Sequence, residues 1–346
     1  MDDIGPLTVF VGNNATGKTN ILESIQLCTA LNSFRNPSPD HLIRSGSSFA
    51  RAVMNITDEN RDLELVLNLE PGKRQYRLNG KKKSIVDLKG LLPAVIFTPD
   101  DLALVKKASS VKREAIDLLG SQLSRNYYIV KRDYEKVVRY KNRLLKEEAD
   151  ESLIESINET FVTCAAQLTC YRWALFARLA ERIGFNYRQI SNGETLGCFY
   201  QPSWGEMTAI EGQEPLLREY VREQLIEQLQ KRKDEERARK KSVVGPHSDV
   251  VELRVNGSDI AHFASQGQQR SAVLAWKLAE VEIIRESLHK NPVLLLDDVM
   301  SELDSVRRNA LVSFVEGSIQ TFITTTNLQY FDKNLLSRAR IIKLPR

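Results

Sequence analysis

Apolar residues near the start of the chain change from a strand pattern to a helix pattern across one glycine-containing segment. Residues 7–11 form a short apolar run that leads directly into Gly12. Beyond Thr19, apolar residues recur at helical spacing at Ile21, Leu22, Ile25, Cys28 and Leu31. The pattern predicts a buried strand, a loop and a helix, in that order.

Strand patterns continue in the next part of the chain. Residues 63–69 alternate between apolar and polar, Pro71 and Gly72 mark a turn, and residues 75–78 lead to a second turn. An apolar run at 91–97 follows. We therefore expect a β-rich region ahead of residue 100.

The middle and the end of the chain differ in pattern. Residues 102–241 are charged and mostly helical in pattern, except at 199–204, where the pattern breaks into strand or loop. Beyond them strands alternate with helices, with strands predicted at 251–255, 293–296 and 320–325 and helices at 270–285 and 305–315. Such alternation is typical of a largely parallel sheet covered by helices, so we expect an α/β fold.

Composition narrows the class of protein. Hydrophobic residues make up 42% and charged residues 27%, as in ordinary globular proteins. No apolar run approaches the roughly 20 residues that span a bilayer, and the N-terminus lacks the features of a signal peptide. The four cysteines show no metal-binding spacing, so we expect reduced structural thiols in a cytoplasmic protein without a membrane contact.

Basic residues are slightly in excess, with a formal net charge of +4. This excess permits contact with a polyanion without requiring it. The densest charge lies at 231–241, where a solvated helix face with i,i+4 ion pairs and a phosphate-backbone contact are both open readings. Other candidates for phosphate contacts are Lys81, Lys82, Lys83, Lys106, Lys107, Lys112 and Arg113.

The segment between the first predicted strand and helix, GNNATGKTN, fits the phosphate-binding pattern GxxxxGK[ST]. In such a loop backbone N–H groups surround the phosphates, the lysine reaches the terminal ones, and the hydroxyl after it binds Mg²⁺. We therefore predict an ATP site formed by Gly12, Asn13, Asn14, Ala15, Thr16, Gly17, Lys18 and Thr19.

Two aspartates complete this predicted site. Asp297 and Asp298 follow the apolar run 293–296 and so lie at the end of a buried strand. A solvated acidic turn is the alternative, which the presence of the glycine loop disfavours. Because consecutive side chains of a strand point in different directions, the two acids can have different roles. We expect Asp297 to bind Mg²⁺ together with Thr19, and Asp298 to polarise an attacking water.

The segment SQGQQR, residues 265–270, precedes the helix predicted at 270–285. A serine and a glycine at a helix start bind anions well, although the segment alone is more often a simple N-cap. A second anion site has a use if two chains meet head to tail. Ser265, Gly267 and Gln268 would then cap the γ-phosphate held by the partner, and ATP would hold the dimer together.

Together, the glycine loop, SQGQQR and the LLLDD strand resemble an ABC-type P-loop ATPase head. A longer match, in order along nearly the whole chain, resembles the RecF family of DNA replication and repair proteins, which are related to SMC heads. The segments that carry it are SQGQQRSAVLAWKLAEVEIIRE, PVLLLDDVMSELD, IFTPDDLALV, YKNRLLKE, VGPHSDVVELRVNG and QTFITTTN.

The resemblance implies an ATPase head formed by residues 1–100 and 242–346, with a mainly helical lobe at 101–241 inserted in it. It implies a homodimer that forms on ATP, binds single-stranded or gapped DNA, hydrolyses ATP slowly and acts in recombinational repair and the SOS response. RecR and RecO, mediators that help to load recombinase, are the implied partners. Thr326 falls where transporters keep a switch histidine.

The sequence departs from the family pattern in two places. Family members have two strands and a turn ahead of the glycine loop, whereas Met1 lies eleven residues before Gly12 here. We expect a shortened start to lower stability and nucleotide affinity. Where the family has GPHRDD, this chain has GPHSDV at 245–250, and we expect Ser248 and Val250 to weaken the role of that turn.

Two other functions share such a head. The ATPase subunit of an ABC transporter would need a short helical segment to dock a permease and a switch histidine, which the long charged insertion and Thr326 disfavour. A scaffold that has lost hydrolysis is disfavoured by Lys18, Thr19, Asp297 and Asp298. Because Asp298 is one methylene shorter than the usual glutamate, we predict slow turnover, as in a weak DNA-linked ATPase.

Overall fold

The computed structural model describes residues 4–35, 38–58, 61–191, 193–207, 214–315 and 319–345. By its internal contacts the chain divides into two compact units. The first joins Met1–Asp101 to Glu280–Arg346, and the second is Leu102–Ala279. Residues 242–279, which the sequence analysis assigns to the head, group with the helices by this measure, and the head boundary at 242 stays a prediction.

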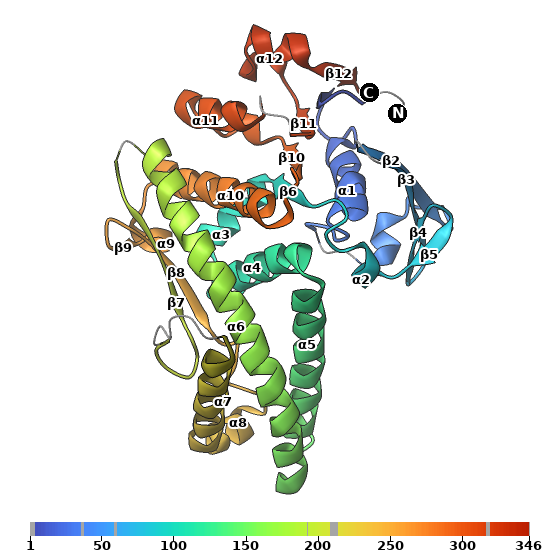
Figure 1. The fold of residues 1–346 in the computed structure, drawn as a ribbon. Helices are drawn as coiled ribbons and strands as arrows, with labels where there is room; N and C mark the ends of the chain where they lie inside the picture. The colour runs from blue at the N-terminus through green and yellow to red at the C-terminus, as the bar shows by residue number, and fades with distance from the viewer. Residues whose placement is uncertain are drawn as a thin grey trace. The chain divides into compact units, whose positions relative to one another are not determined.

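The first unit contains a five-stranded parallel sheet (Figure 1). In spatial order its strands are β12 (Arg340–Lys343), β1 (Leu7–Val11), β11 (Thr321–Thr325), β10 (Val293–Asp297) and β6 (Ala94–Phe97). Strands β10 and β11 are buried at every position, as expected of a parallel sheet covered on both faces. Burial on both faces explains why β10 appears in the sequence as a continuous apolar run. The strands predicted near the glycine loop and ahead of the two aspartates are confirmed.

Helices pack against this sheet. Helix α1 (Lys18–Thr29) places Leu22 in one apolar cluster with Phe10 of β1 and Leu295 of β10. The unit also contains α2 (Ile85–Leu88), α11 (Ser305–Val315) and α12 (Lys333–Arg338), with 3₁₀ turns at η1 (Pro39–Leu42), η3 (Val299–Ser301) and η4 (Leu328–Tyr330). Helix α11 has the bounds predicted from the sequence.

A separate antiparallel sheet lies in the same unit. Its order is β2 (Ala50–Asp58), β3 (Arg61–Glu70), β4 (Lys73–Leu78) and β5 (Lys81–Lys83). The patterns at 63–69 and 75–78 predict β3 and β4, whereas no predicted strand covers β2. Small side chains weaken the apolar alternation of β2, whose core-facing positions include Ala50, Ala52, Met54 and Ile56.

The second unit is mainly helical. Helices α5 (Arg125–Lys146) and α6 (Glu151–Ile190) pack along each other as a long hairpin (Figure 1). A small antiparallel sheet joins β7 (Leu196–Gln201), β8 (Val250–Val255) and β9 (Ser258–Asp259). The break predicted at 199–204 thus begins in strand β7 and ends in the loop after it. The other helices are α3 (Ala103–Lys106), which follows the turn η2 (Pro99–Leu102), α4 (Ser109–Leu123), α7 (Glu214–Lys231), α8 (Lys233–Arg239), α9 (Ile260–Phe263) and α10 (Gln266–Leu288), which continues into the first unit.

The composition predicts no membrane-spanning segment and reduced structural thiols. No helix in the described part of the chain is long and apolar enough to cross a membrane. Burial raises the pKa of the Cys28 and Cys198 thiols to about 12. Both thiols therefore stay protonated at neutral pH. Cys28 is buried and Cys198 is partly buried.

Candidate nucleotide-binding site

The predicted phosphate loop connects the end of β1 to the start of α1. The backbone N–H of Gly12 donates to the carbonyl oxygen of Thr325 at 3.3 Å, which anchors the loop to the neighbouring strand β11. Gly17 ends the loop in the left-handed region, with φ 87°, which glycine adopts without steric cost, and α1 begins at the next residue. The first N–H groups of α1 have no intrahelical partner, so this helix end suits a phosphate.

The side chain of Lys18 folds back over the loop. It is 7% exposed, and its Nζ donates to the carbonyl oxygens of Gly12 and Asn13, both at 2.8 Å. Carbonyl oxygens carry only partial charge, and no carboxylate in the described part of the chain forms an ion pair with Lys18. The ammonium charge is therefore available to an anionic ligand.

The two residues predicted to bind Mg²⁺ lie side by side. The hydroxyl of Thr19 donates to Oδ1 of Asp297 at 3.1 Å, although the residues are 278 positions apart in the sequence. Thr324 of β11, opposite Asp297 in the parallel register, donates to the same oxygen at 2.7 Å. A hydroxyl and a carboxylate oxygen are ligands that Mg²⁺ prefers, so this pair suits the metal ion.

Asp298 has a backbone conformation that few non-glycine residues adopt. Its φ of 53° and ψ of 21° are left-handed, and its N–H donates to the carbonyl oxygen of Thr324 at 3.2 Å and to its hydroxyl at 3.0 Å. Its Oδ1 atom is buried without a hydrogen-bond partner in the described structure. Burial raises the pKa of this carboxyl, an effect that Lys18 opposes and Asp297 reinforces, and the backbone of Thr326 forms a hydrogen bond to it.

These contacts meet the requirements of a bound nucleotide and its metal ion. The loop from Gly12 to Thr19 would hold phosphate groups, and Thr19 with Asp297 would hold Mg²⁺, which neutralises phosphate charge when bound. The unpartnered oxygen of Asp298 leaves one acceptor free for a water molecule. The phosphate loop follows the end of β1, and Asp297 and the candidate base Asp298 lie at the end of β10.

The segment SQGQQR at residues 265–270, here called the signature segment, lies in the second unit. Ser265 caps α10: its hydroxyl accepts from the Gln268 N–H at 3.2 Å, and the Gln268 side-chain oxygen accepts from the Ser265 N–H at 2.8 Å. This reciprocal pair is a capping box. Ser265 is exposed, and Gly267 lies in the first turn of α10.

Comparisons with known proteins agree with this architecture. The family model described as RecF/RecN/SMC N terminal domain matches residues 3–342. The DNA replication and repair protein RecF of Lactobacillus delbrueckii subsp. bulgaricus is 34% identical, with 97% of this chain and 88% of the relative covered. The chain belongs to the RecF family. RecF of Symbiobacterium thermophilum is 38% identical, over 93% of this chain and 86% of that protein.

Solved structures give the same result for the fold of this RecF-family chain. A structure of the recombination mediator protein RecF-ATPrS in the RecFOR pathway has a TM-score of 0.87 and 30% identity, covering 96% of this chain and 89% of that one. The SMC head bound to the C-winged helix domain of ScpA, at 15% identity and a TM-score of 0.52, shares the fold alone. The predicted α/β head fold and its relation to SMC heads are therefore confirmed.

Two residues that contact the predicted site residues are not among those that the sequence pattern singles out. Thr324 hydrogen-bonds both aspartates, and a polar residue at a buried position of the strand TFITT was the available signal. Glu194 accepts a hydrogen bond from the side-chain amide of Gln268 at 2.8 Å. No local pattern marks Glu194, because it meets Gln268 only through the tertiary fold.

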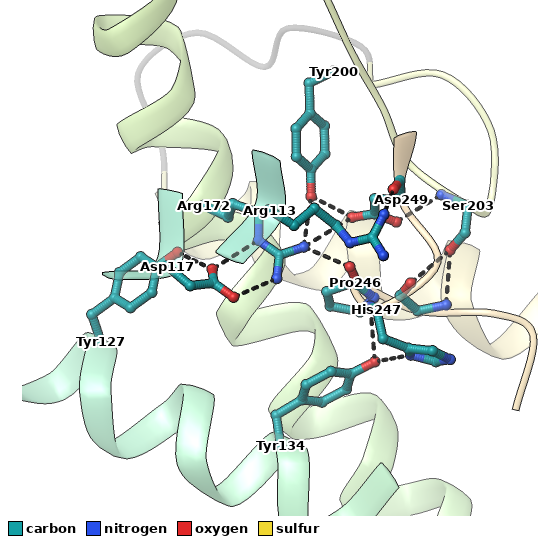
Figure 2. Close-up of polar contacts among 11 residues, drawn as sticks. Arg113, Asp117, Tyr127, Tyr134, Arg172, Tyr200, Ser203, Pro246, His247 and Asp249 are labelled. Atoms are coloured by element: carbon teal, nitrogen blue, oxygen red, sulfur yellow. Dashed lines mark hydrogen bonds and ion pairs between the residues drawn. The ribbon is translucent and has the colours of Figure 1, made fainter. Parts of the chain in front are cut away.

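A second charged cluster lies within the helical unit and is shown in Figure 2. Arg172 of α6, 3% exposed, donates to both oxygens of Asp117 at 3.0 and 2.9 Å and to the carbonyl oxygen of Pro246 at 2.6 Å. Its guanidinium also lies 3.7 Å from Asp249, which is fully buried. The remaining residues labelled there are Arg113, Tyr127, Tyr134, Tyr200, Ser203 and His247.

The turn with the GPHSDV sequence is part of this cluster. Asp249 accepts hydrogen bonds from the Tyr200 hydroxyl and, at 2.8 Å, from the Ser203 N–H. A Cβ at Gly245 would lie 2.7 Å from the Tyr134 hydroxyl, which explains the glycine there. Val250 is 37% exposed at the start of β8. Asp249 of this turn is buried with its hydrogen-bond partners, whereas the expected effect of Ser248 and Val250 stays a prediction.

The structure also sorts the candidate phosphate contacts. Lys112 is 6% exposed and donates to the carbonyl oxygen of Lys107 at 3.0 Å, which disfavours it as a phosphate contact. Arg113 is partly buried and donates to the carbonyl oxygen of Asp249. In the 231–241 run most basic side chains form ion pairs: Lys231 with Glu227, Arg232 and Arg239 with Glu235, Lys233 and Arg237 with Glu151, and Lys240 with Glu148. This pattern favours the solvated-face reading of the run.

Proposed function

We propose that this chain is an ATP-dependent DNA-binding clamp that dimerises on ATP and releases DNA after slow hydrolysis. The observation that carries the proposal is the contact between Thr19 and Asp297, next to an Asp298 carboxyl with an unpartnered oxygen. A solved RecF structure described with ATP, 30% identical with a TM-score of 0.85, supports ATP as the ligand.

Each residue then has a stated role. Lys18 binds the terminal phosphates, Thr19 and Asp297 hold Mg²⁺, and Asp298 accepts a hydrogen bond from the attacking water. Ser265 of one chain caps the γ-phosphate in the other, so the two-fold interface is the same patch on both copies. Family membership favours this reading over the transporter subunit.

The DNA and protein partners follow from the family. We propose that the clamp binds single-stranded or gapped DNA in the cytoplasm during recombinational repair and the SOS response, and that RecR and RecO act with it to load recombinase. Phosphate contacts should dominate, so affinity for a gapped duplex should fall steeply as salt rises from low to physiological concentration. An affinity that does not change with salt would exclude phosphate contacts.

Sedimentation velocity with ATP and Mg²⁺ tests the clamp directly. Wild type should dimerise only with ATP, and Ser265→Arg should stay monomeric while still binding ATP. Ser152→Arg, the same change at an exposed position at the start of α6, is the matched control and should dimerise. A Ser265→Arg protein that dimerises like the control would exclude the trans cap, which is the contact of Ser265 with the γ-phosphate bound by the partner chain.

An exposed aromatic residue offers a second test of the same face. Phe263 is 77% exposed and lies two residues before Ser265. If that surface becomes buried in the dimer, Phe263→Ala should weaken dimerisation by about tenfold. Leu153→Ala, an exposed apolar residue in the first turn of α6, should leave it unchanged.

A further inference from the structure

The side chain of Glu194 contacts the signature segment and the long helix α6 at the same time. Its Oε1 accepts from the side-chain amide of Gln268 at 2.8 Å, and its Oε2 accepts from the Tyr187 hydroxyl at 3.1 Å. Tyr187 is fully buried in α6. All three residues belong to the second unit.

The partners of Gln268 determine which way its amide group is turned. The amide oxygen accepts from the N–H of Ser265, and the amide nitrogen donates to Glu194. An ionised carboxylate can only accept hydrogen bonds, so Glu194 requires the NH₂ side of the amide. The oxygen is thereby left for Ser265, which completes the capping box.

We propose that Glu194 is a positioning residue for the trans cap: it orients Gln268, and Gln268 holds Ser265 at the start of α10. This inference rests on the proposed function, in which Ser265 caps the partner's γ-phosphate. The hydroxyl oxygen of Ser265 accepts from the Gln268 N–H, so its own hydrogen remains available to donate to a phosphate oxygen. The contact with Tyr187 connects Glu194 to helix α6.

Three substitutions at residue 194 test whether a hydrogen-bond acceptor is needed there. Glu194→Gln still presents an oxygen to the Gln268 amide and can donate to the Tyr187 hydroxyl, so it should behave like wild type. Glu194→Ala leaves the amide without this partner. In Glu194→Lys the new ammonium can only donate, so it requires the oxygen of the Gln268 amide. The amide would then turn its NH₂ group toward the Ser265 N–H, which breaks the capping box.

Two quantities should be measured for each variant: the dimer dissociation constant with ATP and Mg²⁺, by equilibrium sedimentation, and the affinity of the monomer for ATP. We expect Glu194→Lys to weaken dimerisation by about tenfold or more, Glu194→Ala by less, and Glu194→Gln to match wild type. Monomer affinity for ATP should not change in any of them, because the phosphate loop lies in the other unit.

Glu148→Lys is the control for the change of net charge, since Glu148 is exposed and, among the described residues, pairs with Lys240. The inference is overturned if Glu194→Lys dimerises like Glu148→Lys, or if Glu194→Gln is as defective as Glu194→Ala. Should Glu194→Lys fail to fold, the comparison of Glu194→Ala with Glu194→Gln decides. A wild type that stays monomeric with ATP overturns the proposed function as well, whereas a dimerising wild type with unaffected variants overturns this inference alone.

Discussion

The Arg172 cluster and the glycine-loop site differ in whether the polar and charged groups have hydrogen-bond partners within the protein. In the helical unit both carboxylate oxygens of Asp249 accept hydrogen bonds, and Arg172 donates to Asp117, Pro246 and Tyr200. In the glycine-loop site, within the described residues, Asp298 keeps an oxygen without a partner and Lys18 donates to two carbonyl oxygens.

This difference separates a structural role from a binding role. Burying a charge without partners is unfavourable, so a cluster that satisfies its own groups stabilises the fold without a ligand. A cluster with unused charge and an unpartnered acceptor is complete only when something else binds. We therefore expect substitutions in the Arg172 cluster to change stability, and substitutions in the loop site to change nucleotide chemistry.

The largest effect on stability should come from Arg172→Met. Removing the guanidinium leaves Asp117 and Asp249 buried without their cation, which should lower the free energy of unfolding by about 3–5 kcal/mol. Urea unfolding measures this quantity. Arg254→Met, the same substitution in an exposed pair with Glu252, should cost less than about 1 kcal/mol. Equal losses in both variants would mean that the Arg172 cluster is not a stabilising element.

Lys18→Ala should produce the largest effect on binding. Loss of the phosphate-binding ammonium should reduce affinity for MgATP about a hundredfold, measured by titration calorimetry. The free energy of unfolding should stay within about 1 kcal/mol of wild type, because Lys18 only contacts loop carbonyls. Lys81→Ala, an exposed lysine of β5, serves as the control for both quantities. A large loss of stability with ATP affinity intact would reverse the contrast between the clusters.

Asp298→Asn tests whether the unpartnered oxygen serves hydrolysis rather than binding. The amide has almost the same size but is a poor base, so the rate of ATP hydrolysis should fall about a hundredfold. Affinity for ATP should remain. Steady-state phosphate release gives the rate, with the exposed Asp100→Asn as the comparison. If the rate in Asp298→Asn equals that of Asp100→Asn, Asp298 is not the base.

The smallest expected effect is in the pH dependence of stability. Burial raises the pKa of Asp298 in the folded state, so the protonated carboxyl stabilises the fold at low pH. The unfolded carboxyl ionises at a pKa of about 3.9, which is below the pKa of the folded carboxyl. The stabilisation is therefore lost as the pH rises from the unfolded pKa through the folded pKa. Asparagine cannot ionise, so Asp298→Asn should gain stability relative to wild type over this range. A difference in unfolding free energy that is independent of pH would contradict this assignment.

Local patterns in the sequence were sufficient to predict the main strands and helices of the head. The apolar run at 7–11, the glycine loop and the helix after it follow one another along the chain, and each has its own signature. The run ahead of Asp297 was recognisable because a strand covered on both faces is apolar throughout. Strand β2 was missed because its alanines weaken the alternation, and the boundary at 242 differs from the division by contacts.

The tertiary structure alone decided how distant residues meet. The parallel register of β10 and β11 brings Thr324 to Asp297, and packing of α1 brings Thr19 to the same carboxylate. Likewise, folding of the second unit pairs Glu194 with Gln268 and buries Lys112, which the sequence presents as one more surface lysine. Periodicity along a chain reports which face of an element is apolar, whereas contacts between elements depend on strand register and helix packing, which no local pattern encodes.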